Sequence, residues 1–137
     1  MIKNKNINFL IVLAVGFSLI FGSLFRLYNI NYENLWFDEI VTFWITDPFI
    51  EINENYKRNS AAGATPFLFN LLLTFAHEIF GYKTYIARYF SAAFGILSII
   101  SVTYLSNLLK KNNSYILVAF LISFNVFLIK YSQEARV

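Results

Sequence analysis

An uncharged apolar run near the N-terminus constrains this chain more than any other feature. The run from Phe9 to Phe25 contains no acidic or basic residue, and it is preceded by Lys3 and Lys5 and followed by Arg26. It is about long enough to cross the apolar core of a bilayer. A cleaved signal peptide also has a basic start and an apolar centre, but the stretch around Gly22 offers no clear small-x-small cleavage site. The run therefore favours a membrane anchor.

Two more apolar runs predict further spans. Tyr89 to Leu109 is uncharged and ends at Lys110-Lys111, whereas Tyr115 to Ile129 is shorter but precedes Lys130, which can snorkel to the interface. Of the residues, 58% are hydrophobic and 14% charged, against about a quarter charged in soluble domains. The sequence predicts an all-α membrane protein with three transmembrane helices. The second run carries small residues on one helical side, which allows close helix approach: Ser91, Gly95 and Ser98.

The run from Phe67 to Phe80 is also apolar, but its periodicity predicts a helix lying in the membrane interface. About fourteen residues are short for a span. Thr65 suits the N-cap, Pro66 the first helical position and Gly81 the stop. We expect a helix over about residues 66–80 with a narrow polar stripe toward water. The stripe consists of Asn70, Thr74, His77 and Glu78.

The lysines orient the three predicted spans. Placing Lys3, Lys5 and Lys110-Lys111 in the cytoplasm obeys the positive-inside rule and puts all eight acidic residues on the other side. The chain is then a multi-pass cell-membrane protein whose loop 26–88 is extracytoplasmic. The basic residues are scattered and form no stripe, so we expect no nucleic-acid partner. Cysteine is absent, which excludes disulfides and thiolate metal sites.

Adjacent carboxylates mark the first part of the extracytoplasmic loop. The pattern predicts an interfacial helix over about residues 35–46, with Asn34 as its N-cap and Asp38 and Glu39 on its polar face. Carboxylates in a Trp-flanked apolar helix at a membrane surface are costly to dehydrate unless they bind something. The alternative is a solvated acidic face, which is favoured near any helix N-terminus.

Other charged residues of the outer side have similar alternatives. Lys57 and Arg58 lie in a predicted linker over residues 53–65, where they are either exposed loop charges or contacts for an anionic headgroup. Glu134 and Arg136 follow the third span, where a polar boundary is also common. His77 is the only histidine, which favours a polar-face role over metal binding.

Four segments of the chain form a recognisable order: Leu35 to Glu39, Thr65 to Leu72, Phe80-Gly81 with Ala87 to Gly95, and Tyr131 to Arg136. In this order and spacing they resemble the N-terminal part of the protein O-mannosyltransferase and lipid A aminoarabinose transferase superfamily of GT-C fold glycosyltransferases. Where this family usually has His-Pro-Pro, the chain has Ala64-Thr65-Pro66. Members usually have many more spans, so we expect residues 1–137 to be the N-terminal part of a GT-C transmembrane domain.

The resemblance implies an inverting transferase that moves a sugar from a polyprenyl-phosphate carrier to a hydroxyl of a lipid, glycan or protein acceptor on the extracytoplasmic side. Asp38 would be the general base, and Glu39 would orient the acceptor or a divalent cation. Glu134 and Arg136 would line the same cavity, with Arg136 donating to the departing phosphate. No further cofactor is implied. The alternative is a small non-catalytic membrane protein or a lipid-carrier transporter subunit.

Overall fold

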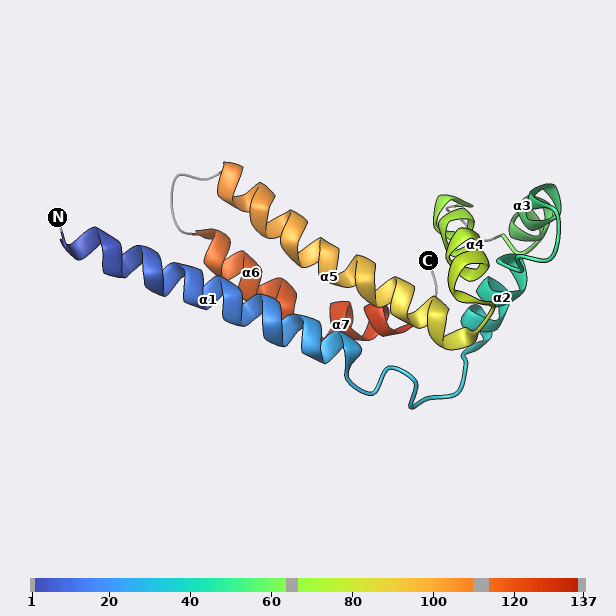
Figure 1. The fold of residues 1–137 in the computed structure, drawn as a ribbon, viewed down its shortest axis with the longest axis horizontal. Coiled ribbons are helices and arrows are strands. Elements are labelled where there is room, and N and C mark those ends of the chain that lie inside the picture. The colour runs from blue at the N-terminus through green and yellow to red at the C-terminus, as the bar shows by residue number, and fades with distance from the viewer. Residues whose placement is uncertain (1, 64–66, 110–113, 136–137) are drawn as a thin grey trace. The chain divides into compact units, whose positions relative to one another are not determined.

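The computed structural model describes residues 2–63, 67–109 and 114–135, with side chains from Leu10 onward, and every regular element among them is an α-helix (Figure 1). The chain divides into a long-helix unit, residues 1–28 and 93–132, and a short-helix unit, residues 29–92 and 133–137. The all-α prediction is therefore confirmed. The helices are α1 (Ile2–Leu27), α2 (Phe37–Ile45), α3 (Ile52–Ala61), α4 (Phe67–Phe80), α5 (Thr84–Leu109), α6 (Ser114–Phe124) and α7 (Val126–Gln133).

Two helices suit a membrane: α1, in the long-helix unit, and α5, whose residues from Ala93 onward belong to that unit. Leu10–Leu27 of α1 and Thr84–Leu109 of α5 are each long and apolar enough to cross one. At about 1.5 Å per residue, a helix of this length covers the apolar core of a bilayer. Large apolar side chains such as Leu13, Ile20 and Leu105 remain exposed on these helices, as expected where lipid is the solvent. Within this unit α1 and α6 run side by side (Figure 1).

The third apolar run differs from its prediction, because the expected helix over residues 115–129 is broken. Its two halves, α6 and α7, are bent by 52° relative to each other. The break falls at Asn125, whose Oδ1 accepts the N–H of Leu128 at 3.0 Å. Asparagine is a strong N-cap, so it starts a new helix where hydropathy alone predicts continuation. Among the residues that the structure describes there are therefore two candidate spans, or three if the bent pair crosses as one.

Arg26 stabilises this break from the end of α1. Its side chain is fully buried, and its Nη1 donates to the carbonyl oxygens of Gly22 at 2.9 Å and Ser123 at 3.2 Å. Its Nη2 donates to the carbonyl of Ile122 at 3.0 Å. A helix that ends leaves its last carbonyls without intrahelical donors. A cation at that end also interacts favourably with the helix dipole. Arg26 thus supplies the donors that the break removes.

Two glycines allow the helices of this unit to approach closely. A Cβ added at Gly22 would lie 2.8 Å from the Cβ of Ser123, and one added at Gly95 would lie 2.5 Å from the Cβ of Ser132. Gly95 belongs to the predicted small-residue seam of α5. Ser98, from the same seam, is exposed and donates to the Gly95 carbonyl at 2.7 Å. The predicted seam of α5 is therefore in close contact with α7 at Gly95, whereas Ser98, one turn later, is exposed.

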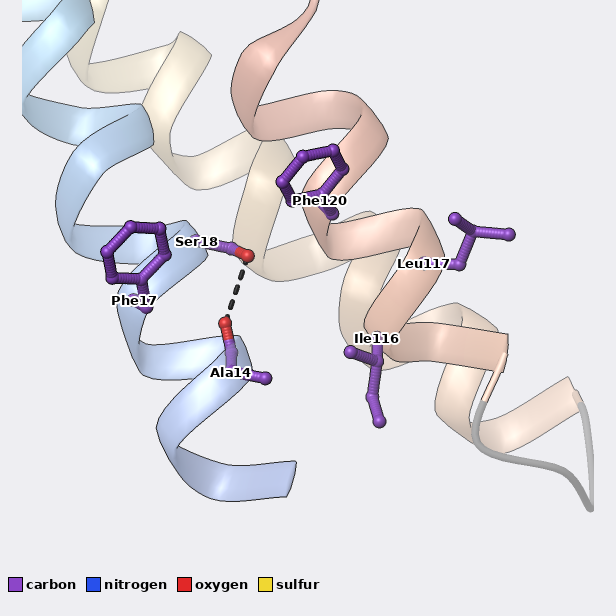
Figure 2. A pocket seen from close by; sticks show the side chains of 6 residues that line it. All are labelled: Ala14, Phe17, Ser18, Ile116, Leu117 and Phe120. Carbon is purple, nitrogen blue, oxygen red and sulfur yellow. Dashed lines mark hydrogen bonds between the residues drawn. The ribbon is translucent and has the colours of Figure 1, made fainter. Parts of the chain in front are cut away.

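A cavity of about 460 Å³ lies between α1 and α6 and is drawn in Figure 2. Ser18 carries the one polar side-chain group in its lining, and that hydroxyl already donates to the carbonyl of Ala14 at 3.0 Å. The cavity therefore offers an apolar surface and no unused donor. Its lining consists of Ala14, Phe17, Ser18, Ile116, Leu117 and Phe120.

In the short-helix unit the helix ends differ in part from their predictions. Asn34 does not cap α2; instead the carboxylate of Glu39 accepts the N–H of Trp36 at 3.1 Å and satisfies the first free donor of that helix. At the end of α4, Gly81 has φ 97° and its N–H donates to the His77 carbonyl, which confirms the predicted stop. The predicted cap of α4, Thr65 with Pro66, lies outside the described residues.

The linker predicted over residues 53–65 is wrong in large part, because Ile52–Ala61 forms α3. This segment has low hydropathy, so the hydropathy pattern does not predict a helix there. Glu54 lies 3.7 Å from Lys57 and 3.9 Å from Arg58, one turn later in each case. Such pairs three and four residues apart stabilise a solvent-exposed helix modestly.

The polar stripe of α4 faces the interior of the short-helix unit, so its predicted orientation toward water is wrong. Asn70 and His77 are 2% and 1% exposed, whereas Ile79 on the opposite side is 74% exposed. Glu78 alone of the predicted stripe is exposed. The helix α2 likewise buries the polar Glu39 and Thr42, together with the apolar Ile45, while Asp38 is exposed. The small apolar core beside these polar groups contains Leu73, Ala76, Ala87 and Ala135, with Phe69 and Phe90 packed against it.

Candidate functional site

The carboxylate of Glu39 is the centre of the short-helix unit's polar interior. Glu39 is 1% exposed and occupies the third position of α2. Its Oε1 accepts the Nε–H of Arg88 at 2.8 Å and the backbone N–H of Ala135 at 2.8 Å. Its Oε2 accepts the Nη2–H of Arg88 at 2.7 Å and the backbone N–H of Trp36 at 3.1 Å. A carboxylate has about four acceptor positions, so this one is fully used.

Arg88, near the start of α5, is equally committed. Besides its two bonds to Glu39, its Nη1 donates to the carbonyls of Ile30 at 3.0 Å and Glu33 at 2.8 Å, and its Nη2 donates to that of Asn34 at 3.2 Å. All five donors of a guanidinium are then occupied. The forked geometry fixes the turn before α2 as well as the helix itself. No role for Arg88 was predicted from the sequence, although a lone arginine at the start of an apolar helix is a signal for one.

The charge on Glu39 follows from these contacts. Burial alone would raise the pKa of the Glu39 carboxyl, but the hydrogen bonds from Arg88 and from the backbone N–H groups of Ala135 and Trp36 outweigh it and lower the pKa. Glu39 is therefore ionised at neutral pH. An ionised, fully bonded carboxylate holds backbone in place and does not exchange protons readily.

Three segments that are far apart in the sequence meet at Glu39. Leu35 to Glu39 supplies the carboxylate, Ala87 to Gly95 supplies Arg88, and the segment from Tyr131 supplies the N–H of Ala135. Glu134 lies in this same unit, is 7% exposed and adds negative charge near Arg88. Arg136 lies outside the described residues.

Asp38 differs from its neighbour Glu39 in its exposure to solvent. Its side chain is exposed at the second position of α2, next to the fixed Glu39. A carboxylate that accepts a proton from a substrate must be reachable by it, and Asp38 meets this condition. The described residues contain no group of three or more His, Asp or Glu side chains that could hold a metal ion. The role of Glu39 toward an acceptor or a divalent cation stays a prediction.

The two basic residues of α3, Lys57 and Arg58, have different surroundings. Lys57 is exposed, and its Nζ lies 3.7 Å from the carboxylate of Glu54 on the same helix. Arg58 donates to the carbonyl of Trp44 at 2.9 Å, lies over that indole ring at 4.8 Å and approaches Asp47 at 3.9 Å. Arg58 therefore joins α3 to the end of α2, and Lys57 is the member of the pair that points to solvent.

His77 occupies a second polar cluster, between α2, α3 and α4. Its Nδ1 lies 3.1 Å from the carbonyl of Thr46, so this nitrogen carries the proton and donates. Burial lowers the pKa of His77, against the opposing effects of the Thr46 carbonyl and the Asp47 charge. Nearby, Tyr82 donates to the Phe43 carbonyl at 2.7 Å, and burial raises the pKa of Tyr82 to about 12. Both groups are neutral at physiological pH.

The arrangement can thus present one reachable carboxylate, Asp38, on a helix whose start is fixed by the buried Glu39–Arg88 pair. Sequence reasoning identified Glu39 but not what it touches, because its charged partner lies 49 residues away. Comparison with protein-family models, with curated proteins and with solved structures finds no significant match to this chain.

Proposed function

We propose that this chain belongs to a membrane glycosyltransferase that takes a sugar from a polyprenyl-phosphate carrier, with Asp38 as the general base. One observation carries the proposal: three segments that resemble this class of enzyme, far apart in the sequence, meet at the Glu39 carboxylate. The candidate membrane spans also suit a lipid-linked substrate.

In this proposal the acceptor hydroxyl loses its proton to the carboxylate of Asp38 as its oxygen bonds to the anomeric carbon of the sugar. The bond between that carbon and the phosphate oxygen breaks on the opposite face, and the phosphate leaves with the electron pair. The configuration at the anomeric carbon therefore inverts. Glu39 and Arg88 are positioning residues here, because they touch the backbone around Asp38 and leave the proton transfer to it.

The remaining polar residues have supporting roles in the proposal. Arg136 donates a forked pair of hydrogen bonds to the departing phosphate, and Glu134 lines the acceptor side. Lys57, exposed on α3, attracts the anionic carrier to the surface, whereas Arg58 contributes by holding α3 to Trp44. The acceptor is a lipid, glycan or protein hydroxyl on the extracytoplasmic side.

Replacing Asp38 by Asn in the chromosomal gene tests the assignment directly. A general base contributes about 10²- to 10⁴-fold to rate, so transfer from a polyprenyl-phosphate sugar in isolated membranes should fall by that factor. Glu51→Gln is the matched control, since it removes an exposed carboxylate at the start of α3 and should leave transfer unchanged. Near-normal transfer by Asp38→Asn, with equal amounts of protein in the membrane, contradicts the proposal.

A non-catalytic role is the second candidate, and one observation favours it. The hydrogen bonds of three charged residues, Glu39, Arg88 and Arg58, are made within the short-helix unit, as expected for residues with a structural role. Deletion of the gene separates the two candidates. If the protein is non-catalytic, deletion of its gene should leave sugar transfer to every acceptor intact. If deletion abolishes transfer and Asp38→Asn has the same effect, the enzyme is supported.

We also propose that residues 26–88 lie on the extracytoplasmic side. The unopposed lysines at residues 3, 5, 110 and 111 favour this orientation. The chain has no cysteine, so single cysteines can report it. Lys57→Cys and Asn112→Cys should react with an impermeant thiol reagent from opposite sides of the membrane. Reaction from the same side contradicts the proposed orientation.

A further inference from the structure

The cavity between α1 and α6 is apolar and lies beside a helix that suits a membrane. We propose that it holds one acyl chain of a membrane phospholipid. All of its lining residues belong to the long-helix unit, so the cavity is a feature of that unit alone. The inference rests on a membrane location for α1, which is long and apolar enough to cross one. It is independent of sugar transfer.

The chemistry of the lining excludes polar occupants. Apart from Ser18, the lining consists of alanine, aromatic and aliphatic side chains (Figure 2). The Ser18 hydroxyl donates to the carbonyl of Ala14 at 3.0 Å, so it offers no further proton. A buried water needs about two to four polar partners, and an apolar cavity stays dry and takes apolar ligands instead. An ion would lose its hydration there without replacement. The occupant is therefore a hydrocarbon.

The size of the cavity fits a single acyl chain. Its volume is about 460 Å³. An apolar protein cavity of about 150 Å³ takes one molecule of benzene, which has six carbon atoms. On that scale this cavity accommodates roughly 18 carbon atoms, the length of one phospholipid acyl chain. A polyprenyl chain has several times as many carbon atoms and exceeds the space.

The cavity opens onto side chains that suit contact with lipid. Phe17 and Leu117, which line it, are 51% and 61% exposed. On the same helix α1, Val12 and Leu13 are exposed outside the cavity. A membrane-crossing helix presents such side chains to lipid tails. An acyl chain therefore reaches the cavity without leaving an apolar environment. There it supplies the van der Waals contacts that the lining atoms lose when the space is unfilled.

Contacts beside the cavity hold its two helices together. Gly22 lies about one turn after Ser18 on α1, and a Cβ added there would lie 2.8 Å from the Cβ of Ser123 on α6. One turn further, the Nη1 of Arg26 donates to the carbonyl of Ser123 at 3.2 Å. These contacts fix α6 to α1 at one end of the cavity. The cavity is therefore a feature of a defined helix pair.

Photolabelling of the full chain in lipid vesicles tests the inference. The vesicles consist of phosphatidylcholine with a diazirine on one acyl chain, and mass spectrometry locates the labelled residues after irradiation. We expect label on Ile116 inside the cavity as well as on Val12 outside it. Ala14→Phe places a ring in the cavity and should remove the label from Ile116. Val12→Phe is the matched control, because it adds the same ring outside the cavity, and it should keep that label.

The wild-type label already decides between occupants. Label on Val12 without label on Ile116 shows that protein covers the cavity, either a second copy or another helix, and overturns the inference. Absence of label from both residues contradicts the membrane location of α1 as well. Displacement of the label on Ile116 by excess polyprenyl phosphate assigns the cavity to a polyprenyl chain instead. If the inference is correct, excess polyprenyl phosphate leaves this label in place.

The variants decide whether the acyl chain enters the cavity. Label on Ile116 that is as strong in Ala14→Phe as in wild type shows that lipid touches the surface only, and this overturns the inference. If circular dichroism shows that Ala14→Phe loses helix, Ala14→Leu takes its place. It fills less of the cavity and should weaken the label on Ile116 without removing it. None of these results depends on Asp38, so failure of the proposed sugar transfer leaves them unchanged.

Discussion

Arg26 of the long-helix unit and Arg88 of the short-helix unit are both buried, but they meet different partners. Arg88 pairs with a buried carboxylate at 2.7 Å and donates to three carbonyls as well. Arg26 donates to backbone carbonyls at the break between α6 and α7. Both arginines therefore donate hydrogen bonds to backbone carbonyl groups near the beginning or end of a helix. Of the two, only Arg88 neutralises another buried charge. We therefore expect replacement of Arg88 to lower the free energy of unfolding more than replacement of Arg26.

The largest effect is expected for Arg88→Met. Removing one member of a buried ion pair leaves the other charge uncompensated, which costs about 3–5 kcal/mol. The free energy of unfolding in mild detergent, followed by circular dichroism during denaturation, should fall by that amount. The double variant Arg88→Met with Glu39→Gln serves as the control, because it strands no charge. It should be less destabilised than Arg88→Met alone. Equal stability of Arg88→Met and wild type contradicts this role for the pair.

Arg26→Met should cost less than Arg88→Met. Each variant leaves three carbonyl groups without their arginine donor, but Arg26→Met strands no charge, whereas Arg88→Met also strands the Glu39 carboxylate. The same detergent unfolding measurement compares the two variants. Arg26→Lys keeps the charge but lacks the forked donors, so we expect it to fall between Arg26→Met and wild type. If Arg26→Met proves as damaging as Arg88→Met, the backbone bonds and not the stranded charge determine both costs.

Glycines of the long-helix unit offer a matched pair of smaller changes. Gly95→Ala places a methyl group 2.5 Å from the Cβ of Ser132, and such overpacking typically costs about 1–3 kcal/mol. Gly16→Ala meets nothing within 4 Å, so it should be neutral or slightly stabilising. Unfolding of the two variants under identical conditions measures the difference. Equal stabilities would show that α5 and α7 can separate at Gly95 without cost.

How far the sequence predicts this fold depends on whether a feature is local. Uncharged length predicted α1 and α5, and the lone Gly81 predicted the end of α4. The bend at Asn125 was missed because one polar residue hardly changes the average hydropathy of a run. The helix α3 was missed because it is polar throughout, although its Glu54 pairs were a local signal.

The orientation of α4 was missed for a different reason. Periodicity shows that a helix has two unlike sides, but it does not tell which side meets protein and which meets solvent or lipid. That choice is made by distant residues, such as Asn59 for Asn70 and Thr46 for His77. The candidate site has the same limit: Asp38 and Glu39 are adjacent in sequence, yet one is exposed and the other is bound to Arg88.

The smallest expected effect is the pH dependence of the free energy of unfolding. It distinguishes the polar cluster around His77 from the one around Glu39, because the two titrate in different pH ranges. Burial lowers the pKa of His77 below its ordinary value of 6.5. As pH falls through that value the unfolded chain takes up a proton at this residue and the folded chain does not. Stability is therefore full above about pH 6.5 and falls as pH decreases below it, with a slope of at most about 1.4 kcal/mol per pH unit. The lowered pKa of Glu39 places its own loss of stability below the ordinary carboxyl range, outside this window.

Because His77 is the only histidine, one variant isolates the effect. His77→Gln keeps a side-chain N–H for the Thr46 carbonyl but cannot gain a proton. The free energy of unfolding, measured in detergent between about pH 7.5 and 5.5, should decline for wild type and stay nearly constant for His77→Gln. Equal slopes in the two proteins would assign the pH dependence to other groups. A wild type that gains stability toward pH 5.5 would mean that His77 is protonated in the folded state, which its burial beside Thr46 opposes.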